Sequence, residues 1–264
     1  MKLLYIGDVM GKAGRDTVDR LLPDLKKELN VDFTIAQAEN SDDFGKGPRP
    51  RDIQQMHEAG VNFFTGGNHS FSNGDTNLLY ANENSKLVRP ANVIDKPGVG
   101  HTIIEFQGKR ILIASILGQT VGSQKFEITN PLKAIDEILF KEKGKFDISL
   151  VNFHGDFSSE KRVFGYYVDG RVSAVVGDHW HVPTADAMIL PGGTAHITDV
   201  GMCGSLHSSL GVKTSVIVDR WKSGKPGKNQ MESQGPCQFN ALLVDIDEQT
   251  GFAKELEHIQ RIIE

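Results

Sequence analysis

The chain has few cysteines and no long apolar segment. Its 264 residues include two cysteines, Cys203 and Cys237, which are too few for the disulfide framework of a small secreted domain. No stretch approaches the roughly 20 consecutive apolar residues of a membrane helix. The apolar run near Met1 spans about six residues, which is shorter than the apolar core of a secretory leader. These absences predict a cytoplasmic protein without a membrane segment.

The chain also lacks an excess of positive charge. Its formal net charge is −5, and its one compact basic cluster is the short run 49–51. This balance argues against general attraction to membrane surfaces or nucleic acid, so we expect no stable binding of long nucleic acid. The content of 39% hydrophobic and 24% charged residues is ordinary for a globular protein. No repeat or linker interrupts the sequence, and we expect one domain over residues 1–264.

Short apolar runs alternate with amphipathic stretches in the first third of the chain. The apolar runs have the length of buried strands, and the spacing of apolar residues between them suits one face of a helix. The expected order is strand 2–7, helix 15–30, strand 32–38, helix 51–59, strand 61–64 and helix 75–82. This alternation predicts parallel strands joined by crossover helices.

The rest of the sequence is richer in strand patterns. We expect hairpins around Gln107-Gly108 and around Asp169-Gly170, because such pairs favour tight turns. The expected elements are strands 101–106 and 110–117, helix 131–142, strand 147–153, a hairpin over 165–177, and strands 187–190, 214–218 and 239–246. The polar, glycine- and proline-rich stretch 219–237 predicts an exposed loop. The predicted fold class is therefore α/β, with two packed mixed sheets flanked by helices.

Residues of metal-binding types follow five of the short apolar runs directly. They are Asp8, the pair Glu39-Asn40, the pair Asn68-His69, His154, and the pair His179 and His181. Open α/β sheets place their ligands at the carboxyl ends of parallel strands. The repeated coincidence predicts that these strand ends converge on one site that holds more than one metal ion.

The types of these residues narrow the chemistry. Carboxylates, side-chain amides and imidazoles without cysteine suit iron, manganese or zinc, and there are more of them than one tetrahedral ion needs. Two ions about 3.5–4 Å apart can hold a hydroxide between them and clamp a phosphoryl group. In an extended segment, His179 and His181 would point to the same face. Gly66 and Gly67 would let the backbone before Asn68 approach a ligand closely.

Each residue also has an ordinary explanation when it is taken alone. Asp8 could cap a helix, Glu39-Asn40 and Asn68-His69 could be turn residues, and His154 could be a buried histidine with satisfied hydrogen bonds. The spacing of His179 and His181 also arises by chance. The joint occurrence at five strand ends favours a metal site over these separate explanations.

Together these motifs resemble the calcineurin-like metallophosphoesterases. They stand as GDVM at 7–10, AEN at 38–40, GNH at 67–69, FH at 153–154 and GDHWH at 177–181. The likeness is closer still to the YmdB-type phosphodiesterases, which share Met10 in place of a histidine and Glu39 in place of an aspartate. Three departures belong to this chain: Asp156 where that branch has glutamate, and Asp178 and Trp180 where it has small polar residues.

The resemblance implies a set of ligands and a reaction. One ion would be held by Asp8, Glu39, Asn40 and His181, and a second by Glu39, Asn68, His154 and His179, with Glu39 bridging. Iron is favoured, with manganese or zinc as alternatives. A hydroxide that bridges the two ions would attack the phosphorus of a phosphodiester, and His69 would donate a proton to the leaving oxygen.

The implied substrates are small cyclic nucleotides, 2′,3′-cyclic first and 3′,5′-cyclic second. A phosphomonoesterase or protein phosphatase that uses the same ions is an alternative, because the sequence does not separate the two kinds of pocket. A non-catalytic regulator that binds a nucleotide or RNA is a third interpretation, which the intact ligand set disfavours. A homo-oligomer is a fair prior expectation for such a protein.

Overall fold

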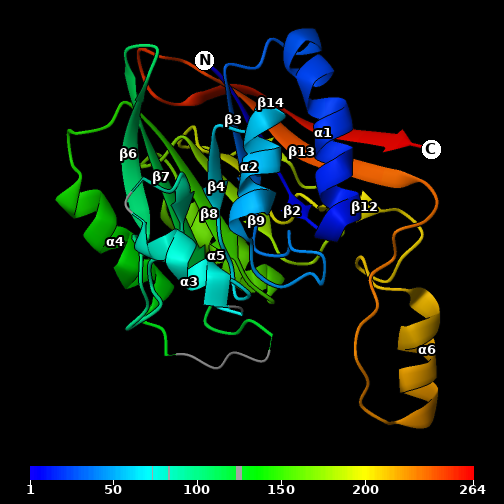
Figure 1. Cartoon of the computed structure of the whole chain (residues 1–264). Helices are drawn as coiled ribbons and strands as arrows, with labels where there is room; N and C mark the ends of the chain where they lie inside the picture. The colour runs from blue at the N-terminus through cyan, green and yellow to red at the C-terminus, as the bar shows by residue number, and fades with distance from the viewer. Residues whose placement is uncertain (73, 83, 123–126) are drawn as a thin grey trace.

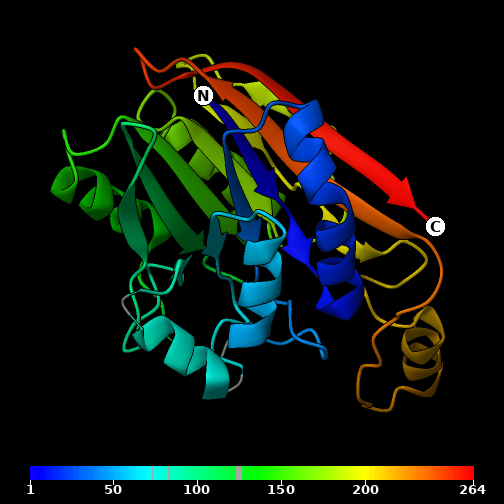
Figure 2. The same cartoon turned by 45° about the horizontal axis from the view of Figure 1, so that its top comes forward.

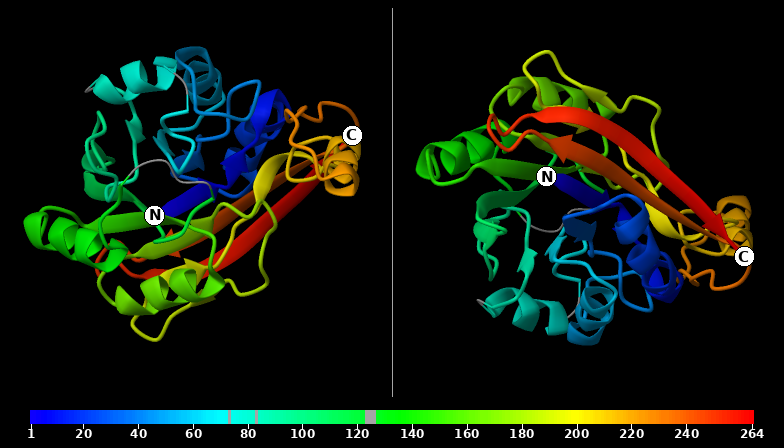
Figure 3. Two further views of the ribbon diagram at one scale, coloured as in Figure 1. Left: turned by 90° about the horizontal axis from the view of Figure 1, so that it is seen from below. Right: turned by 90° about the horizontal axis from the view of Figure 1, so that it is seen from above.

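Two β-sheets pack face to face between two layers of helices in this computed structural model (Figure 1). The structure describes residues 1–72, 74–82, 84–122 and 127–264. Seen from below in Figure 3, helices α1, α2 and α3 lie on one side of the strands, and α4 and α5 lie on the other. The predicted fold class, an α/β fold with two packed mixed sheets flanked by helices, is confirmed.

The first sheet has the strand order β2-β12-β13-β1-β3-β4-β5, and β14 pairs with β13 outside this path. Strands β1, β3, β4 and β5 are parallel, whereas β13 runs antiparallel to β1. The parallel strands are linked through helices, as the alternation in the sequence predicts. The bounds are β1 Lys2–Ile6, β2 Asp8–Val9, β3 Phe33–Gln37, β4 Phe63–Thr65, β5 Leu87–Val88, β12 Met202–Ser205, β13 Cys237–Ile246 and β14 Ala253–Ile263.

The second sheet has the order β10-β11-β9-β8-β7-β6. Its four central strands are parallel, and the edge strands β6 and β10 are antiparallel to their neighbours. The predicted hairpin around Gln107-Gly108 joins β6 to β7. The bounds are β6 His101–Phe106, β7 Lys109–Leu117, β8 Ile148–His154, β9 Ala174–Asp178, β10 Met188–Ile189 and β11 Ala195–Ile197.

Successive side chains of the strands fill different layers of the core. In β1, Leu4 and Ile6 pack beneath the helices of the first sheet, whereas Leu3 and Tyr5 pack between the two sheets. This follows from the alternation of side chains along a strand, and burial of both faces explains why the run is continuously apolar. The helices are α1 Gly11–Glu28, α2 Pro50–Glu58, α3 Gly74–Ala81, α4 Pro131–Lys141, α5 Ser158–Tyr167 and α6 Thr214–Ser223.

Two of the predicted strand segments are wrong. The hairpin expected over residues 165–177 is instead the end of helix α5, a turn at Gly170 and strand β9, which pairs parallel to β8. The buried side chain of Phe164 packs against Phe153, at 4.5 Å between ring centroids, and this contact holds the helix on the second sheet. The glycine turn is real, but it joins a helix to a strand.

The strand expected at residues 214–218 is the first half of helix α6. This helix buries no side chain, and Figures 1 and 2 show it set apart from both sheets. Its β-branched residues all stay outside the buried core, and Gly224 ends the helix in the left-handed conformation with φ 64°. The stretch 219–237 is exposed or half-buried throughout, as predicted, but residues 219–223 form the end of α6, so the predicted loop begins only after the helix.

Within the described residues, no helix combines the length and the apolar character that crossing a membrane requires. The single domain over residues 1–264, the cytoplasmic location and the homo-oligomer stay predictions.

Candidate metal centre

The carboxyl ends of strands from both sheets meet at one place in the fold. Strands β1, β3 and β4 of the first sheet are parallel, as are β8 and β9 of the second. Asp8, Glu39 and Asn68 follow the ends of the first three strands, His154 ends β8, and His179 follows β9. Parallel register places these chain reversals at one end of each sheet, and the contacts of His154 with Asn68 and Glu39 show that the two ends meet.

One group of contacts surrounds Asn40. Its amide Nδ2 donates to Asp8 Oδ1 at 3.1 Å and to Glu39 Oε1 at 3.0 Å. The same nitrogen lies 3.4 Å from His181 Nε2, and that Nε2 lies 3.7 Å from Asp8 Oδ2. The side chains of Asp8, Glu39, Asn40 and His181 are all buried. These four residues therefore form one compact set of oxygen and nitrogen atoms.

A second group of contacts surrounds His154. Its Nε2 lies 2.7 Å from Asn68 Oδ1 and 3.2 Å from Glu39 Oε1. The ring of His179 lies beside it, with 4.5 Å between ring centroids. Glu39 thus belongs to both groups. The backbone N–H of His69 donates to Glu39 Oε2 at 2.7 Å, so the half-buried His69 lies directly beside the cluster.

The segment that carries His179 and His181 is a bend, and the prediction of an extended segment is wrong. His179 has φ 99° and His181 has φ 64°, a region that residues other than glycine rarely adopt. Asp199 Oδ2 accepts the N–H of Trp180 at 2.9 Å and anchors the bend. Strained residues of this kind cluster at functional sites. The bend brings both rings to the cluster. An extended segment, with both side chains on one face, would have had the same result.

Each imidazole has one ring nitrogen held by an acceptor outside the cluster. Nδ1 of His154 lies 2.6 Å from Asp178 Oδ1, and Nδ1 of His181 lies 3.2 Å from the carbonyl oxygen of Leu210. His179 is turned the other way, with Nε2 2.7 Å from Asp156 Oδ1. Since a carboxylate or carbonyl oxygen only accepts, each of these nitrogens carries a proton. The opposite nitrogens are left to face the cluster.

Burial and charge shift the pKa values of the cluster strongly. Burial, and then the charges of Asp178 and Glu39, raise the pKa of Asp8 well above its usual range. Burial also opposes ionisation of Glu39, but His154 outweighs it and holds the Glu39 pKa low. Burial lowers the pKa of His154, yet Glu39 and Asp178 together raise it well above normal. A positive charge stabilises these neighbouring carboxylates, and a proton or a cation can supply it.

The residues present fit a bound cation. His179 Nδ1 is buried and has no hydrogen-bond partner among the described residues, and burial lowers the pKa of this ring to about 4, which keeps it neutral. In the described part of the chain, no lysine or arginine pairs with Asp8, Glu39 or Asp178. Carboxylate and amide oxygens together with imidazole nitrogens are the donor chemistry of iron, manganese and zinc.

Gly67 shows how closely the backbone approaches this set. A Cβ atom at this position would lie 2.3 Å from Glu39 Oε2 and 2.7 Å from His154 Cε1. Any side chain would therefore displace two members of the cluster. The sequence Gly66-Gly67 ahead of Asn68 predicts that the backbone approaches a ligand closely. In the structure, the groups next to Gly67 are the side chains of Glu39 and His154.

Two residues beside the cluster were not predicted from the sequence to have a role. Asp178, which stands out in the sequence only as a departure from the resembling branch, contacts His154. The buried ammonium of Lys161 donates to Asp199 Oδ2 at 2.8 Å and to the backbone oxygen of Asp178 at 2.6 Å. It also lies 4.1 Å from the centre of the Trp180 ring. No local pattern marks these contacts, because their partners lie on other strands and helices.

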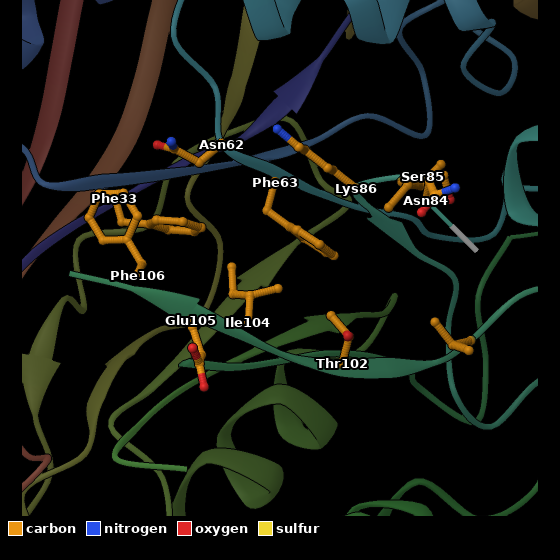
Figure 4. A pocket seen from close by; sticks show the side chains of 12 residues that line it. Phe33, Asn62, Phe63, Asn84, Ser85, Lys86, Thr102, Ile104, Glu105 and Phe106 are labelled. Atoms are coloured by element: carbon orange, nitrogen blue, oxygen red, sulfur yellow. The ribbon is translucent and has the colours of Figure 1, made fainter. Parts of the chain in front are cut away.

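A separate cavity of about 380 Å³ opens at the other end of the strands (Figure 4). Phe33 and Phe63, the first residues of β3 and β4, line it together with Ile104 and Phe106 of β6. None of the predicted site residues lines this cavity. The polar cluster at the carboxyl ends is therefore the candidate site for chemistry.

Comparison with known proteins places this chain in a family. The family model described as YmdB-like protein matches residues 4–259. The chain belongs to this family. A Bacillus subtilis (strain 168) relative, named a 2′,3′-cyclic-nucleotide 2′-phosphodiesterase, is 36% identical over 260 residues, which cover 98% of this chain and 96% of that protein.

Solved structures share the fold of this chain. A hypothetical protein from Thermus thermophilus matches with TM-score 0.90 and 34% identity, over 99% of each chain. A Mycoplasma pneumoniae protein described as a novel phosphatase matches with TM-score 0.92 and 33% identity, over 99% of this chain and 93% of that one. The NAD nucleotidase of Haemophilus influenzae shares the fold alone, with TM-score 0.61, 13% identity and coverage of 100% and 56%. The fold is the calcineurin-like one, and this fold implies divalent metal ions.

Proposed function

We propose that this YmdB-like protein is a metal-dependent phosphodiesterase that hydrolyses cyclic nucleotides, with 2′,3′-cyclic nucleotides as the preferred class and 3′,5′-cyclic nucleotides as the second. The observation that carries the proposal is the meeting of five strand ends in one buried cluster of carboxylates, amides and imidazoles. The name of the Bacillus subtilis relative supports the choice of substrate.

We assign two ions to this cluster. One would be held by Asp8, Glu39, Asn40 and His181, and the other by Glu39, Asn68, His154 and His179. Glu39 is the shared ligand because its carboxylate contacts both groups. Iron is the favoured metal, with manganese or zinc as alternatives. Bound cations would supply Lewis acidity towards the phosphoryl oxygens and lower the pKa of a bound water towards neutrality.

The side chains around the cluster set the remaining chemistry. His69 is half-buried, and its backbone N–H is fixed on Glu39. Its imidazole lies at the edge of the cluster, with Nδ1 3.4 Å from Ser72 Oγ. We assign it the transfer of a proton to the leaving 2′ oxygen of the ribose, a contribution of typically 10²–10⁴-fold in rate. Asn40 is the one proposed ligand that could serve instead by orienting Glu39, since its amide nitrogen faces that carboxylate.

A phosphomonoesterase is the second candidate, and the Mycoplasma pneumoniae structure described as a novel phosphatase favours it. The same ions would serve both reactions. A non-catalytic regulator that binds nucleotide or RNA is the third. The two enzymes differ in whether the ester keeps a second carbon substituent, and the regulator differs from both in producing no turnover.

A panel of esters separates these candidates. The protein would be purified, analysed for its metal content, and assayed with 2′,3′-cyclic AMP, 3′,5′-cyclic AMP, bis-p-nitrophenyl phosphate and p-nitrophenyl phosphate. The proposal expects about two ions per chain and the highest kcat/KM on the 2′,3′-cyclic nucleotide, with a 3′-monophosphate as product. Faster hydrolysis of p-nitrophenyl phosphate than of either diester would favour the phosphomonoesterase. Two bound ions with no hydrolysis of any ester would favour the regulator.

A further inference from the structure

Asp178 is a fully buried carboxylate at the end of β9, directly before the bend that carries His179 and His181. Its Oδ2 accepts hydrogen bonds from the Tyr5 hydroxyl at 3.0 Å, Gln37 Nε2 at 3.0 Å and Asn152 Nδ2 at 2.7 Å. Its Oδ1 faces His154 Nδ1 at 2.6 Å. Four donors from four side chains therefore satisfy one buried carboxylate.

These donors come from both sheets. Tyr5 lies in β1 and Gln37 in β3 of the first sheet, whereas Asn152 and His154 lie in β8 of the second. Within the described chain, the ammonium of Lys161 contacts the backbone oxygen of Asp178, and its ion pair is with Asp199. The Asp178 carboxylate is thus held in place by neutral donors and by one imidazole. It cannot rotate away from His154 without leaving buried donors unpaired.

This arrangement fixes which nitrogen of His154 faces the candidate metal centre. The carboxylate accepts the proton of Nδ1, so Nε2 is turned towards Asn68 Oδ1 and Glu39 Oε1. A carboxylate behind a histidine ligand fixes the orientation of the ring and increases the basicity of the ligand. Among the described residues, the acceptor at the corresponding nitrogen of His181 is the carbonyl oxygen of Leu210, at 3.2 Å. The hydrogen bond at His154 Nδ1 is shorter than the one at His181 Nδ1, and its acceptor is a carboxylate.

We propose that Asp178 is a positioning residue for the metal centre, which orients His154 as a ligand of the ion that Asn68 and His179 also bind. The inference rests on the proposed function in one respect, the assignment of two ions to the cluster. It assigns a role to Asp178, which occupies a position where the YmdB-type phosphodiesterases have a small polar side chain. It also predicts that the two ions depend on Asp178 unequally, because among the described residues the one hydrogen bond of its side chain to a proposed ligand is with His154.

The opposing interpretation is that Asp178 only joins the two sheets. A purely structural role would lower stability and weaken both ions together, or neither. A positioning role weakens one ion selectively. Counting ions and measuring each affinity separates these outcomes without use of enzymatic activity.

The experiment titrates Mn²⁺ into the metal-free full chain by isothermal calorimetry, with electron paramagnetic resonance to distinguish a coupled ion pair from a single ion. Asp178→Asn keeps the size of the side chain and removes its charge, and Asp178→Ala removes all four hydrogen bonds. We expect Asp178→Asn to weaken the second ion by about 10–100-fold and to leave the affinity of the first within about threefold. At Mn²⁺ concentrations that fill both sites of the unaltered chain, the variant would give the spectrum of a single ion.

Asp147→Asn is the matched control. Asp147 directly precedes β8, the strand that ends with His154. Its carboxylate accepts hydrogen bonds from Arg110 at 2.7, 2.9 and 3.1 Å. This substitution should lower the Tm without changing either ion affinity. The Tm of each metal-free variant shows whether it is folded. If Asp178→Asn folds poorly, Gln37→Met and Tyr5→Phe, which weaken the hold on Asp178 from the other sheet, give the same comparison with a smaller loss of the second ion.

Two results would overturn the inference. One is retention of both affinities in Asp178→Asn, and the other is an equal loss of both. An unaltered chain that binds no ion pair would overturn this inference together with the proposed dinuclear centre. An unaltered chain that binds two ions but hydrolyses no ester would contradict the proposed function alone, and the selective loss in Asp178→Asn would still stand.

Discussion

Glu39 accepts a hydrogen bond from the backbone N–H of His69 at 2.7 Å, and this bond joins the loop after β3 to the loop after β4. The bond uses the main chain of His69, so its imidazole is not required to hold Glu39 in place. The backbone of His69 therefore positions Glu39, and its imidazole is free to take part in the chemistry.

Replacing His69 by alanine should remove the proposed proton donor and spare the ions. The backbone N–H remains to bind Glu39, so we expect metal content to stay within error of the unaltered protein. The kcat for 2′,3′-cyclic AMP should fall by about 10²–10⁴-fold. Elemental analysis and steady-state kinetics on the same preparation test this, with the exposed His207→Ala as control. A metal-free His69→Ala protein would make His69 a ligand and contradict its assigned role.

Glu39→Gln should weaken both ions. Oε1 of Glu39 accepts from Asn40 Nδ2 and Oε2 accepts from the His69 backbone, so an amide NH₂ on either side meets a donor. It also removes the charge shared by the two proposed ions. We expect less than one ion per chain after dialysis and no measurable hydrolysis. Glu58→Gln, at the exposed end of α2, is the control. Full activity in Glu39→Gln would rule out the bridging assignment.

Gly67→Ala should disrupt the cluster without unfolding the protein. The added methyl would overlap Glu39 Oε2 and the ring of His154, and both must move to admit it. We expect hydrolysis to fall by at least about 10²-fold, since small displacements of catalytic groups have effects of this size. Gly74→Ala is the matched control because a methyl there meets no atom within 4 Å. Equal activity of the two variants would show that the cluster tolerates displacement.

Removal of metal by a chelator should lower thermal stability. Asp8, Glu39 and Asp178 are all fully buried, and without a cation their charges repel across the cluster. A ligand present at 100 times its Kd stabilises the folded state by about 2.7 kcal/mol, which corresponds to a Tm change on the order of 5–10 °C for a chain of this size. Calorimetric scans before and after dialysis against EDTA measure it, and added Mn²⁺ should restore the original Tm. An unchanged Tm would indicate that no structurally important ion is bound.

Much of the fold could be predicted from the spacing of apolar residues. The alternation of strands and helices before residue 82 is confirmed, because strands buried on both faces have continuous apolar runs that are visible in any window of the sequence. The two wrong strands, at 165–177 and 214–218, have equally β-prone residues. Their conformation depends on contacts outside the window: Phe164 packs on the second sheet, and α6 buries none of its side chains.

The sequence by itself determined which residues end the strands of the candidate site. Asp8, Glu39, Asn68, His154 and His179 lie at the ends of their apolar runs, and the parallel connections place them at one end of each sheet. Only the tertiary structure decided what stands behind each ligand. Asp178 meets His154 across a strand pair and meets Tyr5 and Gln37 across the gap between the sheets. Such contacts join residues that are far apart in the chain, and their geometry depends on how two sheets pack, which no local pattern encodes.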